Sequence, residues 1–285
     1  MRSKLDNDHI SDEDYKKMRN LITLAFTGLV LIIGLLAAIN MSTHSSDADI
    51  EAVSIANKLY ESGQYDQAAQ IYLHIISQGV QDSAIFYNMG NVYYKQGDLG
   101  RAIVNYERAA LMDPRDSDIQ ANLLIARKQT EQSESFPTIA TGPVDSFTRL
   151  IGSWFSIDET AILALGLWFA FSMLFLVWLQ LEPGKARTWM GYSAFMTLLI
   201  VAVLSLSIGN RIYNEKVHQT AVVVADEITI NSQPGDHYAT EYSLQNGSEV
   251  ILLGTQGDWA HLSTPGETME GWIPLSAVEY VWRIG

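Results

Sequence analysis

Two long runs without charged residues constrain the fold of this chain most strongly. They cover residues 161–179 (AILALGLWFAFSMLFLVWL) and 189–208 (WMGYSAFMTLLIVAVLSLSI). At a rise of about 1.5 Å per residue, a helix of this length matches the hydrocarbon core of a bilayer, which is about 30 Å thick. A soluble core would have to bury both helices all round, and the rest of the chain is too polar and too small for that. The two runs therefore predict a transmembrane hairpin with helices at 161–181 and 189–208.

A third apolar run, LITLAFTGLVLIIGLLAAI, covers residues 21–39. It follows a polar segment at 1–20 and is longer than the 7–15-residue apolar region of a typical cleavable signal peptide. This favours an uncleaved signal-anchor, and a cleaved signal peptide remains the alternative.

The positions of Lys and Arg predict the orientation of these spans, because cytoplasmic loops carry an excess of both residues. Lys185 and Arg187 lie in the short loop between the two later spans, whereas Arg211 and Lys216 follow the last span and weigh mildly the other way. Five basic residues precede the first span: Arg2, Lys4, Lys16, Lys17 and Arg19. The N-terminus and the hairpin loop are therefore expected in the cytoplasm, with residues 40–160 and 209–285 outside.

Composition argues against several classes of function. The chain has 18 basic and 32 acidic residues, a net charge of −14, so a clustered basic surface for nucleic acid is not expected. It has no Cys, which excludes thiol nucleophiles, disulfides and cysteine-type zinc sites. The six His form no HExxH or HxxxH pair, and the phosphate-binding GxxxxGK[ST] pattern and the GxSxG nucleophile motif do not occur. We therefore expect a protein that is not an enzyme and that holds no metal or cofactor.

A repeat with a period of 34 residues lies between the apolar runs at 21–39 and 161–179. The segments GQYDQA (63–68) and GDLGRA (97–102) align, as do Asn57 with Asn91 and Tyr72 with Tyr106. The second copy, FYNMGNVYYKQGDLGRAIVNYERAALMDP, resembles the tetratricopeptide repeat (TPR).

The TPR resemblance implies an α-helical solenoid of helix pairs. Gly90 is then the small residue at the helix crossing, Gly97 turns the chain and Pro114 ends the unit. We expect a TPR domain over 49–130, which consists of two repeats, the first at about 49–82, and a capping helix at 118–128. Three residues of the capping helix are expected to close the stack: Leu123, Leu124 and Ala126.

The resemblance also implies an inner groove lined by the first helix of each repeat. Asn amides and Tyr hydroxyls in such a groove can hydrogen-bond an extended peptide, and Lys can meet a carboxylate. The alternative is that these residues only serve helix packing and solvation. The candidate groove residues are Asn57, Tyr60, Tyr87, Asn91, Tyr94, Lys95 and Lys128.

A polar linker with two prolines begins at residue 131 and leads to the second span, so we treat 131–158 as a connecting segment. Its last part contains apolar residues at helical spacing, namely Phe147, Leu150, Ile151, Trp154 and Phe155. This spacing predicts either a helix lying in the membrane interface or a simple lead-in to the span.

From residue 218 to 285 the pattern changes to short β-branched segments with Gly-rich breaks, which predicts a small all-β barrel. The order of Pro234-Gly235, Asp258-Trp259 and Gly271-Trp272 resembles the bacterial SH3-like (SH3b) domain. Asn231-Ser232-Gln233-Pro234 stands where many SH3b domains have Arg-Ser-Gly-Pro. Trp259 and Trp272 fit the barrel core best, and ligand-stacking surface residues are the alternative.

The order of signal-anchor, TPR, hairpin and SH3b resembles the BatE-type proteins of the bacterial aerotolerance (Bat) operon. This resemblance implies a multi-pass scaffold or assembly protein of the bacterial inner membrane, with its TPR and SH3b domains in the periplasm. The implied partners are Bat-type von Willebrand factor A-domain membrane proteins and a MoxR-type ATPase system, in addition to membrane lipid. The alternative function is an envelope anchor that binds peptidoglycan through the SH3b domain.

Overall fold

The computed structural model describes residues 18, 20, 21, 28, 47–130, 143–217, 219–235, 237, 239–264 and 269–281. The chain divides into two compact units. One unit comprises Met1–His44 and Ala161–Ser205, and the other comprises Ser45–Thr160 and Leu206–Gly285.

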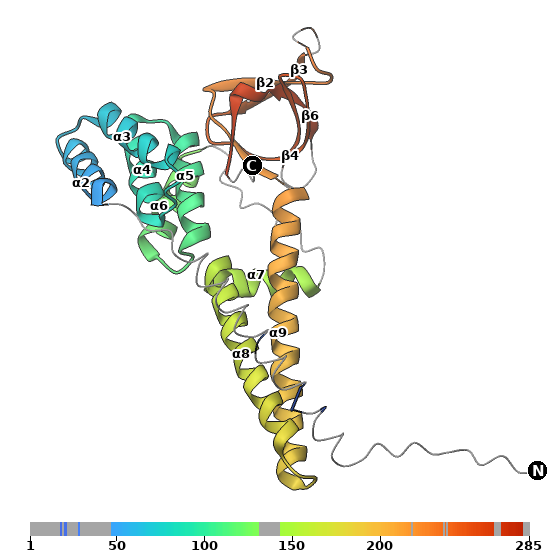
Figure 1. Ribbon diagram of the computed structural model, residues 1–285. Helices are drawn as coiled ribbons and strands as arrows, with labels where there is room; N and C mark the ends of the chain where they lie inside the picture. The colour runs from blue at the N-terminus through green and yellow to red at the C-terminus, as the bar shows by residue number, and fades with distance from the viewer. Residues whose placement is uncertain are drawn as a thin grey trace, which may run out of the picture. The chain divides into compact units, whose positions relative to one another are not determined.

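Two helices of the structure are long and apolar enough to cross a membrane. They are α8 (Ile157–Gln180) and α9 (Lys185–Val217), which form the hairpin seen in Figure 1. The most apolar 18-residue windows within Ile157–Gln180 and Lys185–Asn214 have mean hydropathies of 2.4 and 2.0. The predicted first span, 21–39, lies almost entirely outside the described residues and stays a prediction.

The predicted end of the third span at residue 208 does not coincide with the end of its helix, because α9 continues to Val217. Loss of hydropathy ends a membrane span, but it does not end a helix when the following residues are good helix formers such as Arg211 and Lys216. The first described strand of the C-terminal region begins at Gln219, and the predicted boundary at 218 lies just outside the described residues.

Five helices form the repeat region, and Figure 1 shows them as a succession of antiparallel pairs. Asp82, Asp98 and Asp116 each cap the helix that follows by accepting hydrogen bonds from its first backbone N–H groups. Gly97 ends a helix with φ 84°, a left-handed conformation that favours glycine. The helices are α2 (Asp47–Glu61), α3 (Tyr65–Ser77), α4 (Ser83–Gln96), α5 (Leu99–Met112) and α6 (Ser117–Gln129).

The predicted close crossing at Gly90 is confirmed. A Cβ atom placed on Gly90 would lie 2.6 Å from the ring of Tyr106, which is too close for any side chain. Tyr106 and Ala102 are fully buried, and Ala56 occupies the corresponding small position of the first repeat. The helix pair therefore depends on a small residue where the second helix crosses the first.

The capping helix is only partly as predicted. Leu123 and Ala126 are buried, but Leu124 is 52% exposed. The buried residues Ile119, Leu123 and Ala126 lie at i, i+4 and i+7, and they form one face of α6. Leu124 is rotated about 100° from Leu123 around the helix, so it leaves that face.

The segment before the second span contains α7 (Pro143–Trp154), as the apolar spacing predicted. Leu150 and Trp154 are 60% and 61% exposed. Residues 131–142 of the predicted linker lie outside the described residues. The interfacial and lead-in interpretations of α7 both remain predictions.

The C-terminal region is an antiparallel sheet of seven strands in the order β3-β2-β6-β5-β4-β1-β7, and it curls around a core (Figure 1). The core consists mainly of aliphatic side chains, among them Val223, Ile230, Val250, Leu262 and Ile273. A 3-10 turn (Leu275–Ala277) precedes the last strand. The strands are β1 (Gln219–Val223), β2 (Glu227–Asn231), β3 (Ala239–Gln245), β4 (Glu249–Gln256), β5 (Trp259–Ser263), β6 (Glu270–Pro274) and β7 (Val278–Tyr280).

The prediction that Trp259 and Trp272 form the barrel core is wrong. Both are half-buried, and the core positions of their strands belong to their neighbours, such as Ala260 and Ile273. Because side chains alternate across a strand, the two Trp residues lie on the outer face.

The repeats and the barrel pack against each other within one compact unit, and Gly100 marks their closest approach. A Cβ atom on Gly100 would collide with the carbonyl oxygen of Val223 in β1. The backbone N–H of Gly100 donates a 2.6 Å hydrogen bond to Oδ1 of Asn246. Val222 and Val281 from the barrel join the buried cluster of α5 and α6. The barrel therefore packs mainly on α5, the second helix of the second repeat.

We predict that Gly100→Ala loosens this junction. The added methyl group has no space beside Val223, and such overpacking typically costs about 1–3 kcal/mol. Hydrogen exchange on the full-length chain in detergent should show faster exchange at the start of α5 and in β1. Gly209→Ala is the matched control, because nothing lies within 4 Å of a Cβ at that helical glycine. Unchanged protection in Gly100→Ala would contradict the assigned packing.

Candidate protein-binding site

The first helices of the repeats are tied to their neighbours by a polar ladder that repeats every 34 residues. In the first rung, the Tyr72 hydroxyl donates to Oδ1 of Asn57, which also accepts from Nδ2 of Asn88 at 3.2 Å. In the second rung, Tyr106 donates to Oδ1 of Asn91 at 2.7 Å, and Asn122 donates to the same oxygen at 2.9 Å. Each rung therefore joins one helix pair to the first helix of the next.

The second rung shows that α6 is a true first helix of a third repeat, because Asn122 takes the place that Asn88 has in the first rung. Burial raises the pKa of Tyr72 to about 12, and burial likewise raises the pKa of Tyr106. Both hydroxyls therefore stay protonated and remain donors at neutral pH.

The ladder divides the predicted groove residues into two groups. Asn57 and Asn91 use their carbonyl oxygens within the fold, and the hydroxyls of Tyr87 and Tyr94 accept hydrogen bonds from Asn122 and Gln129. These four residues are half-buried, which is the structural role that the sequence left as an alternative. To a ligand, Asn57 and Asn91 can still offer amide hydrogens, and Tyr87 and Tyr94 can offer their ring faces.

The second group consists of Tyr60, Lys95 and Lys128. Lys95 and Lys128 are exposed, and Tyr60 is half-buried with its ring 5.5 Å from that of Tyr65. Burial, together with the neighbouring Tyr65 and Tyr87, raises the pKa of Tyr60, so its hydroxyl is a donor at neutral pH. This arrangement suits a ligand that brings carbonyl or carboxylate oxygens.

The junction between repeats and barrel holds a group of charges that sequence analysis missed. Arg127 of α6 binds Glu107 of α5, and its Nε lies 2.6 Å from Oε1 of Glu249 in β4. The side chains of Glu107 and Glu249 are only 12% and 6% exposed. Two carboxyl groups therefore share one guanidinium group in a site with little water.

A second arginine fixes the last strand. Arg108 donates to the backbone oxygens of Tyr280 and Val281 at 2.6 and 2.8 Å, and its Nη1 lies 3.0 Å from Oε1 of Glu279. Asp98 and Arg101 extend this group, with Arg101 Nε 3.7 Å from Glu279. The second helix of the second repeat, α5, is thus also the face on which the barrel docks.

The outer face of the barrel carries an aromatic pair. His261 and Trp272 are opposite each other on β5 and β6, and their rings stack at 4.6 Å. Trp259 is two residues before His261 on the same face. Trp259 and Trp272 therefore lie at the surface of the barrel, which was the alternative to a place in its core.

Metal binding has no support in the described part of the chain, where no group of three or more His, Asp and Glu side chains is placed to hold an ion.

Comparison with known proteins identifies one repeat directly. Residues 83–116 match the tetratricopeptide repeat family. This segment runs from the start of α4 through α5 to the N-cap of α6, so the TPR prediction is confirmed for the second repeat. No curated protein sequence matches the chain.

Two solved structures of the Yersinia enterocolitica type III secretion chaperone SycD resemble the chain weakly. One is a complex with a peptide of the translocator YopD, with 19% identity and a TM-score of 0.29. The other is an alternative dimer, with 18% identity and a TM-score of 0.29. Each match covers 56% of this chain and 95% of the SycD chain. Because these identities and TM-scores are low, the functional proposal rests on the repeat and its contacts.

We predict that the junction is weaker at high pH than at mildly acidic pH because of Glu107. Burial, and secondarily the charge of Glu249, raises the pKa of Glu107 above 4.5, its usual value, although Arg127 acts in the opposite direction. The folded chain therefore keeps a proton that the unfolded chain has lost, and the free energy of unfolding falls as pH rises from 4.5 through the raised pKa.

Thermal unfolding of the full-length chain at pH 5 and pH 8 measures this effect. Glu107→Gln keeps the shape of the protonated side chain, so its free energy of unfolding should depend less on pH, by about 1.4 kcal/mol for each pH unit by which the pKa is raised, and its Tm should change less between the two pH values. Glu61→Gln, at an exposed position of α2, should leave the pH dependence unchanged. Equal pH dependence in Glu107→Gln and the unchanged chain would contradict the prediction.

Proposed function

We propose that this chain is a non-enzymatic, membrane-anchored scaffold protein whose TPR groove binds an extended segment of a partner protein. The observation that carries the proposal is the repeat itself, matched at 83–116 and tied to its neighbours by the 34-residue ladder. The polar side chains of the ladder hydrogen-bond one another and so hold the helices together. The ladder leaves Tyr60, Lys95 and Lys128 available at the groove.

The membrane part of the proposal rests on α8 and α9, which are long and apolar enough to span a bilayer. Lys185 and Arg187 lie in the first turn of α9, next to the turn between the two helices, so the positive-inside rule favours a cytoplasmic turn. Both the repeats and the barrel are then on the opposite, periplasmic side of a bacterial inner membrane. Their packing within one compact unit agrees with this, since both must share one side.

The order of domains supports a more specific role. We propose that the chain works as a BatE-type assembly protein with Bat-type von Willebrand factor A-domain membrane proteins and a MoxR-type ATPase system, and that this function serves envelope or oxidative-stress tolerance. The seven-stranded sheet is then an SH3b-type domain that docks on the repeats.

We predict that the double variant Lys95→Glu, Lys128→Glu weakens binding of the partner segment about tenfold. Each lost exposed ion pair is worth up to about 1 kcal/mol, and a tenfold change in affinity corresponds to 1.4 kcal/mol. Co-purification of Bat-type membrane proteins from detergent extracts measures the effect. Lys58→Glu, an exposed residue of α2 outside the predicted groove, is the matched control. Retention of the partner by the double variant would move the binding site away from the groove.

The topology is tested with reporter fusions along the chain. Fusions at Ser135 and after Gly285 should both report a periplasmic position, and a fusion at Lys185 should report a cytoplasmic one. A cytoplasmic result at Ser135 would contradict the orientation and also the proposed presentation of the groove.

The aromatic pair on the barrel favours one alternative function, an envelope anchor that binds peptidoglycan. His261 and Trp272 stack in a half-buried position where a sugar ring can pack on them. Saturable co-sedimentation of the full-length chain with purified peptidoglycan, lost in Trp272→Ala but kept in Leu253→Ala, would favour this alternative. Leu253 is a suitable control because it is 47% exposed on β4.

A further inference from the structure

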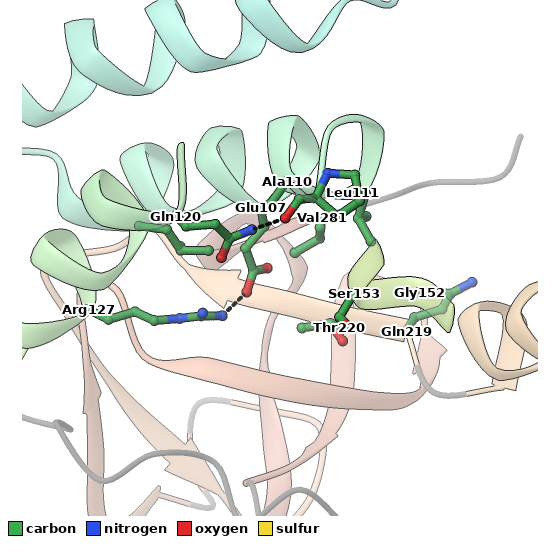
Figure 2. A pocket seen from close by; sticks show the side chains of 12 residues that line it. Glu107, Ala110, Leu111, Gln120, Arg127, Gly152, Ser153, Gln219, Thr220 and Val281 are labelled. Carbon is green, nitrogen blue, oxygen red and sulfur yellow. Dashed lines mark hydrogen bonds and ion pairs between the residues drawn. The ribbon is translucent and has the colours of Figure 1, made fainter. Parts of the chain in front are cut away.

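The compact unit of repeats, α7 and barrel contains a cavity of about 440 Å³, which is within the usual size range of ligand sites. Its wall is apolar at Leu111 and Leu123 and polar at Glu107 and Arg127, with Ser153 of α7 and Thr220 of β1 on the opposite side. Figure 2 shows the Glu107 side chain pointing from α5 into this space, with Arg127 reaching it from α6. None of the predicted groove residues lines the cavity.

The repeat register explains why a cavity exists here. Phe86, Gly90 and Tyr93 form the face of α4 that α5 covers, because Phe86 packs with Ala109 and Gly90 lies against Tyr106. The residues of α6 that lie 34 positions later are Gln120, Leu124 and Arg127. In a complete repeat a second helix covers this face, and among the described residues Gln120 and Arg127 line the cavity and Leu124 is exposed.

The charge at the cavity depends on the protonation of Glu107. Glu107 and Glu249 share Arg127, so this group of three is neutral while Glu107 keeps its proton and has a formal charge of −1 when both carboxyls are ionised. The neighbouring cations are engaged elsewhere, Arg108 with Glu279 and Arg115 with Glu159. The guanidinium of Arg211, which lies beside Gly152 in the wall, donates to the backbone oxygen of Phe155 at 3.1 Å. A second cation beside Glu107 would favour the ionised carboxyl, so its binding releases the Glu107 proton to solvent and leaves two cations facing two carboxylates.

We propose that this cavity binds a Lys or Arg side chain of a partner protein, flanked by apolar residues, with the cation at Glu107 and the apolar neighbours against Leu111 and Leu123. This extends the proposed protein-binding function, on which it rests, to a second surface with its own specificity. The groove then recognises oxygen acceptors, and the cavity recognises a cation.

The chemistry is tested first with a small probe on the full-length chain in lipid nanodiscs. 4-Fluorobenzamidine carries an amidinium group on an apolar ring, and 4-fluorobenzamide is its neutral match. Fluorine NMR should show saturable broadening of the benzamidine signal only, and Glu107→Gln should weaken this binding at least tenfold. Glu61→Gln is the control for a lost surface carboxylate.

A second variant separates charge from folding effects. Leu111→Trp should fill the cavity from its rim, where Leu111 is 37% exposed, and should block the probe while Glu107 stays in place. Equal broadening by both probes, or benzamidine binding that survives both variants, would overturn the proposal.

The protein partner is tested by a photo-crosslinking amino acid at Ser153, which also lines the cavity. We expect crosslinks to a partner segment with Lys or Arg between apolar residues, and Glu107→Gln should abolish them. Crosslinks only to lipid or to a second copy of this chain would overturn the proposal. If the cavity tests fail while partner binding still depends on Lys95 and Lys128, the cavity inference is wrong and the proposed groove function stands.

Discussion

The contact between Gly100 and strand β1 is the constraint on which the packing of the repeats against the barrel depends. Without a Cβ at this position, the start of α5 lies directly on the carbonyl of Val223, and the Asn246 amide links the two by bonding Gly100 and the oxygen of Val224. This approach places Arg108 on the last strand and Arg127 on β4. A repeat region that is short for a solenoid thereby gains a hydrophobic partner from its own chain.

Sequence analysis reached those parts of the structure that depend on local spacing. The 34-residue period correctly predicted the helix pairs, the crossing at Gly90 and the turn at Gly97, because each depends on residues close in the chain. Alternation of apolar residues similarly predicted a C-terminal β-region. The alternation did not predict on which face of the sheet Trp259 and Trp272 lie, because their face depends on the register of β5 and β6. Gly271 contributes to this register, since it provides space for the side chain of Ile230.

The docking of the barrel on the repeats could not be predicted in the same way. Gly100 and Asn246 are 146 residues apart, and Arg127 and Glu249 are 122 apart. A glycine in the first turn of a helix and a glutamate at the start of a strand each have ordinary local explanations. One signal was present, since two and a half repeats leave an apolar helix end that some partner must cover. Nothing in the spacing identified the barrel as that partner.

The candidate site shows a similar division between what the fold uses and what it leaves for binding. In the ladder, Asn91 has two donors on one oxygen, so its removal would affect the packing of three helices as well as any ligand. Residues of this kind are poor reporters of binding, although a groove pattern in sequence ranks them first. The exposed Lys95 and Lys128 are better reporters because neither forms an ion pair with another described residue.

Two of the chain's many acidic side chains have a specific place at the junction between the repeats and the barrel. Most acidic side chains of such a protein are solvated and contribute little, but Glu107 and Glu249 are buried side by side with one arginine. Replacing such a group by apolar residues is often neutral or stabilising, so stability alone does not explain it. The same carboxyl, Glu107, points into the cavity between α5, α6, α7 and β1 (Figure 2). An acid with little exposure in the wall of a cavity is what a site for a basic partner segment requires, and the same two helices, α5 and α6, supply both the acid and the apolar wall.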